Sequence, residues 1–153
     1  MNLDENYKAL DKPGRDKFKR MCEYYGWEYG EPQNDKLAFD CWFKAEGYLW
    51  LVEIKDRGPE AEKYDDLILE VDRYERIAKW NNKLYEQGVP IGGSLYVNWI
   101  GDTAYIFELW EDYVTKNRTS FLMNEVTARS REEKVMKDVF LLPKSKAIVR
   151  KLQ

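Results

Sequence analysis

The chain has 153 residues, of which 44% are hydrophobic and 35% are charged, with a formal net charge of −3, as is typical of one globular domain. The absence of histidine excludes Ser-His-Asp and Cys-His triads and histidine zinc sites, so catalysis has to use carboxylates, Lys, Tyr or a metal on oxygen ligands. No apolar run approaches the roughly 20 residues that span a bilayer and residues 1–15 lack a signal-peptide-like stretch, so we expect a cytoplasmic protein outside the membrane.

The first half of the chain is predicted to hold one helix and three strands. In chain order these are a helix from Pro13-Gly14 to Gly26 and strands at 27–29, 37–43 and 48–54, with a hairpin connection at 44–47. The last of these strands is apolar on both faces up to its end, which places it in the centre of a sheet. Cys41 fits a small buried hydrophobe within a strand, and two cysteines are too few for a disulfide framework or a zinc site.

The second half is predicted to continue with a helix and a hairpin. In order we expect a long helix at 64–87, strands at 94–99 and 104–109, a helix around 132–140 and a basic tail after Pro143. The element order α-β-β-β-α-β-β predicts an α/β fold with a mixed β-sheet flanked by helices. We expect a single domain over residues 1–153, with its core at 13–110 and a basic C-terminal extension at 113–153.

Charge is distributed unevenly between these two parts. The extension holds ten Lys and Arg against four acids, a net charge of +6, out of whole-chain totals of 25 basic and 28 acidic residues. Positions 1–112 keep 15 basic and 24 acidic residues, a net charge of −9. This asymmetry favours a polyanion partner such as DNA, and a solvated basic helix explains it equally well.

Three charged residues stand where strands are otherwise apolar. The hairpin register that pairs Phe43 with Trp50 also places Asp40 opposite Glu53, with Cβ atoms ~4.5–5.5 Å apart, and Lys55 projects to the same side as Glu53. Two carboxylates held so close repel each other unless a raised pKa, a neighbouring Lys or a divalent cation relieves them. Mg²⁺ binds through one or two carboxylates plus water and phosphate. The trio therefore indicates a site for phosphodiester hydrolysis without histidine.

The segments Phe39-Asp40 and Val52-Glu53-Ile54-Lys55, on a hairpin before a long helix, resemble the PD-(D/E)XK nuclease superfamily over residues 13–110. The details are most similar to small phage- or prophage-type endonucleases, and more distantly to Holliday-junction resolvases and RecB-like nucleases. The resemblance implies a restriction-endonuclease-like core and a metal-dependent deoxyribonuclease that acts on DNA. It implies that Asp40 and Glu53 ligate Mg²⁺ or Mn²⁺, and that Lys55 positions the attacking water or stabilises the transition state. Many small members act as dimers, so the resemblance also suggests a homodimer.

Two outer features of the superfamily are matched less closely. RecB-like members carry Gln-x-x-x-Tyr on the helix after the motif, and Glu70 and Tyr74 keep that spacing, on one helical face. A core-edge aromatic is the more ordinary interpretation of Tyr74. Some relatives place an acid on the first helix, for which Asp16 and Glu23 are the nearest candidates, neither at a convincing match. Phe39 replaces the Pro of the superfamily pattern.

Two other hypotheses compete with an active nuclease. One is a catalytically inactive protein of the same fold that serves as a DNA-binding or assembly module, which the unsecured third acid favours. The other is a generic α/β interaction protein in which Glu53 and Lys55 merely cap a strand. In that case both side chains would lie in open solvent.

Overall fold

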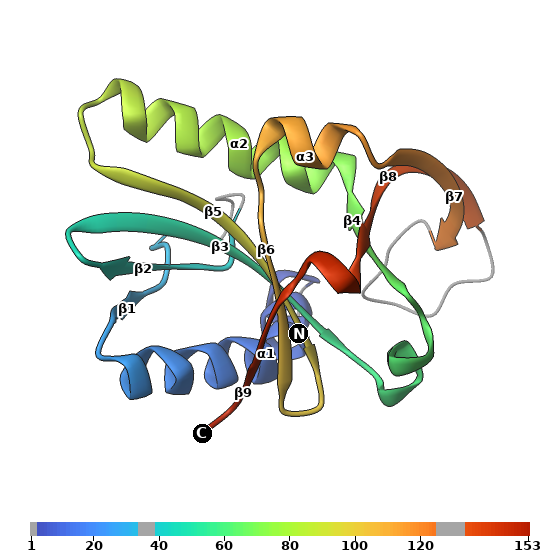
Figure 1. The fold of residues 1–153 in the computed structure, drawn as a ribbon, viewed down its shortest axis with the longest axis horizontal. Helices are drawn as coiled ribbons and strands as arrows, with labels where there is room; N and C mark the ends of the chain where they lie inside the picture. Colours follow the sequence, from blue (N-terminus) through green and yellow to red (C-terminus); the bar gives the residue numbers. More distant parts are fainter. Residues whose placement is uncertain (1–2, 34–38, 125–133) are drawn as a thin grey trace.

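The computed structural model describes residues 3–33, 39–124 and 134–153, with side chains described for 12–33, 39–120 and 136–153. The described chain forms two sheets, a six-stranded sheet in the order β1-β2-β3-β5-β6-β9 and a three-stranded sheet in the order β4-β8-β7 (Figure 1). The helices are α1 (Leu3–Tyr25), α2 (Val71–Glu86) and α3 (Glu111–Thr115); the strands are β1 (Glu28–Gly30), β2 (Cys41–Ala45), β3 (Tyr48–Arg57), β4 (Asp66–Glu70), β5 (Ile91–Ile100), β6 (Thr103–Glu108), β7 (Arg118–Asn124), β8 (Lys134–Pro143) and β9 (Ile148–Lys151); 3₁₀ turns lie at Pro59–Lys63 and Lys144–Lys146. Within these described residues, no helix is both long and apolar enough to cross a membrane.

Helix α1 ends where the sequence predicts but begins earlier. Its end at Gly26 is confirmed, and Gly26 has φ +76°. The Gly26 amide donates to the Glu23 carbonyl at 3.3 Å, and the Trp27 amide donates to the Cys22 carbonyl at 2.8 Å. These two bonds form a Schellman motif. The predicted start at Pro13-Gly14 was wrong, because Pro13 lies inside the helix. Gly14 instead serves packing, since a Cβ there would lie 2.8 Å from Ile54 Cγ2.

The central strand β3 is confirmed as the middle of the main sheet. It pairs antiparallel with β2 in the predicted register, Phe43 opposite Trp50, and parallel with β5 on its other edge. A parallel pair needs a crossover connection, and the segment carrying α2 supplies it. The first part of the predicted strand 37–43, residues 37 and 38, lies outside the described residues.

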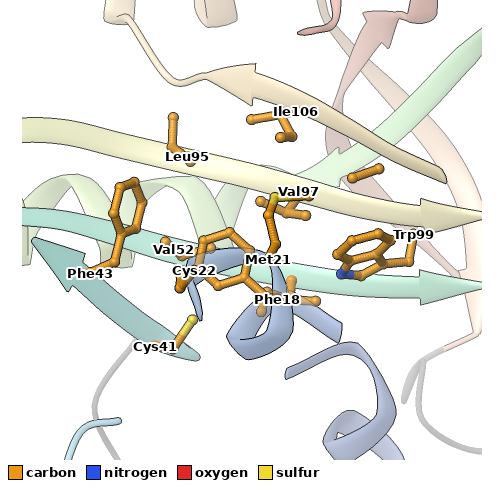
Figure 2. Close-up of a cluster of buried hydrophobic side chains, with 12 residues drawn as sticks. Phe18, Met21, Cys22, Cys41, Phe43, Val52, Leu95, Val97, Trp99 and Ile106 are labelled. Atoms are coloured by element: carbon orange, nitrogen blue, oxygen red, sulfur yellow. The ribbon is translucent and has the colours of Figure 1, made fainter. Parts of the chain in front are cut away.

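Helices α1 and α2 cover opposite faces of the main sheet (Figure 1). Helix α1 closes one apolar cluster, in which Phe18, Met21 and Cys22 meet Val52 and Val97 (Figure 2). Both cysteines are buried and unpaired by disulfide, and burial, with Glu23 adding to it, raises the pKa of Cys22 to about 12. A second apolar cluster joins β5 and β6 of the main sheet to β4, α2, α3 and β8.

Three further predicted elements differ from the structure. The helix predicted at 64–87 is confirmed only from Val71, because Asp66–Glu70 is strand β4, whose Leu67 and Leu69 are buried. The helix predicted at 132–140 is wrong, since residues from Lys134 onward form β8, which pairs with β4 on one edge and β7 on the other; residues 132 and 133 lie outside the described chain. The tail predicted after Pro143 contains β9, which pairs with β6.

Candidate active site

Asp40 is fixed at the entrance to strand β2 by two hydrogen bonds to β3. Its backbone amide donates to the Val52 carbonyl at 2.9 Å, and its carboxylate Oδ2 accepts the Ile54 amide at 2.6 Å. The carboxylate thus takes a position that a backbone carbonyl would occupy in a continuing ladder. Because Val52 and Ile54 flank Glu53, these two bonds hold Asp40 beside Glu53. The register of β2 with β3 ends at Cys41 opposite Val52, so the pairing of Asp40 directly opposite Glu53 stays a prediction, and the carboxylate-to-amide bond was not predicted.

Glu53 and Lys55 are both half-buried on β3. Val52 and Ile54 point into the cluster under α1, so the alternation of a strand directs Glu53 and Lys55 to the opposite face, beneath α2. Glu53 is paired in register with Tyr96 of β5. The half-buried state of both side chains argues against the hypothesis that they cap a strand in open solvent.

Arg73, near the beginning of α2, is a residue that the sequence interpretation missed. Burial lowers the pKa of its guanidinium, but the carboxylates of Glu53 and Asp40, with smaller effects from Glu70 and Asp72, outweigh burial and raise the pKa. Arg73 therefore lies in the field of both candidate metal ligands, while part of its side chain is exposed. A cation on the helix facing two carboxylates relieves the repulsion that the sequence predicted there.

The placement of α2 over Asp40 has independent support. The rings of Phe39 and Trp80 meet edge to face with centroids 6.4 Å apart, so the residue before Asp40 contacts α2. Residues 73, 77 and 80 fall on one helical stripe, and Ile77 is 1% exposed. Arg73 is a charged residue one turn before Ile77 on this stripe, although the residue as a whole is exposed. This interruption of an apolar stripe is the signal by which the sequence could have revealed it.

The carboxylates of Asp40 and Glu53 are the smallest set of protein ligands that would suit a hard divalent cation. Asp40 is bonded to the backbone on both sides of Glu53, and Mg²⁺ commonly binds through one or two carboxylates while waters and phosphate complete its shell. Among the residues that the structure describes, no group of three or more acidic, His or Cys side chains is placed to hold a metal. Asp40 and Glu53 are the two carboxylates that could take part in holding an ion, and the described residues form no larger group with them.

A buried polar network ties the end of β3 to β5 and β4. Arg57 donates from Nε to Asn98 Oδ1 at 2.8 Å and from one terminal nitrogen to the Ile68 carbonyl and the Tyr96 hydroxyl at 2.7 and 3.0 Å. The Tyr96 hydroxyl donates to the same Ile68 carbonyl at 2.7 Å. Asn98 is fully buried and stands opposite Lys55 in the register of β3 with β5. The network therefore fixes the strand that carries Glu53 and Lys55.

The predicted supporting pair is divided between two surroundings. Glu70 is the last residue of β4, directly before α2, so the expectation that it shares a helical face with Tyr74 was wrong. Its carboxylate pairs with Lys137 of β8 at 2.8 Å. Tyr74 lies on α2 with its ring edge to face against Phe140, at a centroid distance of 5.3 Å. This is the core-edge packing that was the ordinary interpretation of Tyr74.

The first-helix acids lie away from the trio. Asp16 pairs with Lys12 at 2.9 Å with its side chain 59% exposed, and Glu23 is exposed near the end of α1. Helix α1 covers the face of β3 that carries Val52 and Ile54, which is opposite to Glu53 and Lys55. Asp16 and Glu23 are therefore not brought to the two carboxylates.

Several cations of the basic extension are engaged within the protein. Arg118 pairs with Asp138 at 2.6 Å, Lys137 pairs with Glu70, and Lys144 Nζ donates to the Ala61 carbonyl at 2.7 Å. Arg129 and Arg131 lie outside the described residues. Arg118 and Lys137 thus stabilise the second sheet, and Lys144 binds the 3₁₀ turn Pro59–Lys63.

Comparisons with known proteins bear on the fold. No protein-family model matches this sequence, and no curated protein matches it. The Holliday junction resolvase Hjc of the archaeal hyperthermophile Archaeoglobus fulgidus is similar in structure, with a TM-score of 0.50 and 12% identity over 89% of this chain and 90% of its own. The bacterial homing endonuclease I-Ssp6803I gives a TM-score of 0.42 and 19% identity over 66% of this chain and 64% of its own. The likeness to the resolvase confirms the predicted restriction-endonuclease-like α/β fold.

Proposed function

We propose that this chain is a metal-dependent deoxyribonuclease that hydrolyses phosphodiester bonds of DNA at Asp40, Glu53 and Lys55. The observation that carries the proposal is the bond from the Ile54 amide to the Asp40 carboxylate, which holds two acids together beneath a helix that presents Arg73. The protein to which the chain is similar in fold is named a Holliday junction resolvase. These features support DNA as the substrate and a divalent cation, Mg²⁺ or Mn²⁺, as the cofactor.

Each residue has a role that follows from its chemistry. Asp40 and Glu53 would hold the cation, which when bound polarises the phosphate and lowers the pKa of water. Lys55 donates hydrogen bonds to the phosphate and neutralises the negative charge that grows on it in the transition state. The Arg57 network orients β3 so that Glu53 and Lys55 keep their positions during the reaction.

The direct test compares Asp40→Asn with wild type on linear, nicked and branched DNA in Mg²⁺, Mn²⁺ or EDTA. Asparagine can still accept the Ile54 amide through its carbonyl oxygen, so the variant keeps the fold while losing the charge. We expect cleavage by wild type with metal only, and loss of most cleavage in Asp40→Asn. Asp16→Asn is the matched control, because Asp16 lies on α1, on the other side of the sheet, and pairs with Lys12 at 2.9 Å.

Equal cutting by wild type and Asp40→Asn would overturn the proposed site. If wild type binds DNA without cutting it and binds no Mn²⁺, the chain is instead an inactive DNA-binding module.

Removing Arg73 is predicted to strengthen metal binding to the protein without DNA. The guanidinium is a positive charge in the field of the same carboxylates, so it opposes a second cation there. We expect Arg73→Met to lower the Kd for Mn²⁺ about threefold to tenfold, measured by titration calorimetry. Arg76→Met, an exposed residue in the next turn of α2, should leave the Kd unchanged. Weaker or unaltered Mn²⁺ binding in Arg73→Met would contradict the proximity argued above.

A further inference from the structure

A cavity of about 870 Å³ adjoins the candidate site on its Lys55 side. Its walls are the end of β3, the 3₁₀ turn Pro59–Lys63 and strand β4, and Lys55 is one of the lining residues. Asp40 and Glu53 do not line it, so the cavity extends beyond the reacting centre. Its volume is within the ~300–1,000 Å³ usual for small-molecule sites, which is enough for one nucleotide.

The charges of this cavity disfavour a second phosphate. The Arg57 guanidinium is used by Asn98, Tyr96 and the Ile68 carbonyl, and Asp56 lies in an ion pair with Lys17. The other charged residues that line the cavity are three acids, Glu60, Asp65 and Asp66, and two lysines, Lys55 and Lys63. A net acidic wall repels phosphate, whereas carboxylates accept hydrogen bonds from the amino groups of bases. The chemistry therefore fits a nucleobase.

Tyr64 supplies a stacking surface on the wall of the cavity. It is 54% exposed, and Lys63 Nζ lies 5.2 Å from its ring centroid. The turn before it is anchored, because Ala61 is buried, the Tyr64 amide donates to the Ala61 carbonyl at 3.3 Å, and Lys144 binds the same carbonyl. An exposed aromatic on a fixed turn is suited to stack on a base, whatever its identity.

We propose that this cavity binds one unpaired nucleobase next to the scissile phosphate, with Tyr64 stacked on the base. The proposal rests on the proposed nuclease function and names a substrate class for it: DNA with an unpaired nucleotide at the cut. A base inside a duplex stack cannot enter the cavity without being flipped out, and flipping costs least for a base that is already unpaired.

The test uses two duplexes. In the bulged duplex, 2-aminopurine is the single unpaired nucleotide; in the other, the 2-aminopurine is paired. Binding is followed by 2-aminopurine fluorescence in the non-cutting Asp40→Asn protein, and cleavage is followed in the wild-type background. We expect stacking to quench the fluorescence, and Tyr64→Ala to lower the preference for the bulged duplex about tenfold. Tyr64→Phe should keep the preference. Tyr85→Ala is the matched control, since Tyr85 is 73% exposed on α2.

The outcomes separate this inference from the function on which it rests. Equal cutting of both duplexes by wild type, or an unchanged preference in Tyr64→Ala, would overturn the nucleobase site while leaving the nuclease intact. Quenching that depends on Tyr64, with no cutting by wild type in any metal, would uphold the nucleobase site and overturn the proposed activity.

Discussion

Replacing Lys55 with alanine is expected to lower the rate of DNA cleavage by about 10²–10³-fold. Lys55 is half-buried on β3, where water screens a charge less than it does at an open surface. The charge that develops on the phosphate in the transition state would lose this donor, while the two carboxylates would remain. We therefore expect Mn²⁺ affinity and the free energy of unfolding to stay near the wild-type values, so that the loss falls on the rate of the chemical step.

The measurement is single-turnover cleavage with protein in excess over DNA, beside Mn²⁺ titration of both proteins. Lys79→Ala is the matched control, because it removes an exposed lysine of α2 with the same change of net charge. A Lys55→Ala protein that cuts as fast as wild type would remove Lys55 from the mechanism. A large loss of Mn²⁺ binding would instead show that Lys55 organises the carboxylates.

The elements predicted well are those whose pairing partner is close in sequence. Strands β2 and β3 meet through the turn at Glu46-Gly47, and β5 and β6 through Gly101-Asp102, so alternation and turn residues determine register within some twenty residues. Strand β4 pairs with β8, Leu67 opposite Leu142, across a separation that no local pattern reveals. Its apolar residues fit a helix and a strand alike, and pairing with the distant β8 decides between them.

The same distinction applies to the candidate site. Asp40 and Glu53 belong to one hairpin, so a register argument could place them together. Arg73 lies in their electrostatic field from a helix that belongs to the crossover, and Asn98 bonds to Arg57 from the next parallel strand. Neither contact follows from spacing along the chain. The sequence therefore predicts the three residues of the motif, and the surroundings that adjust their electrostatics and orientation require the tertiary structure.

Replacing Arg57 with methionine is expected to lower the free energy of unfolding by about 2–4 kcal/mol. The substitution keeps an apolar stem but leaves the fully buried Asn98 with its Oδ1 unsatisfied, and the cost of an unpaired buried acceptor is about 1–3 kcal/mol. The loss of charged hydrogen bonds to β4 adds to this. Urea unfolding followed by tryptophan fluorescence measures the difference.

The network predicts an order among its variants that simple loss of packing would not. Tyr96→Phe should cost about 1 kcal/mol, because the Ile68 carbonyl keeps its bond from Arg57 at 2.7 Å. Asn98→Leu should lower the free energy of unfolding more in the wild-type protein than in the Arg57→Met protein. With both partners removed, neither is left unsatisfied. Additive losses across this double-mutant cycle would mean that Arg57 and Asn98 contribute independently. Coupling would establish that one buried network joins the strand of Glu53 and Lys55 to β5.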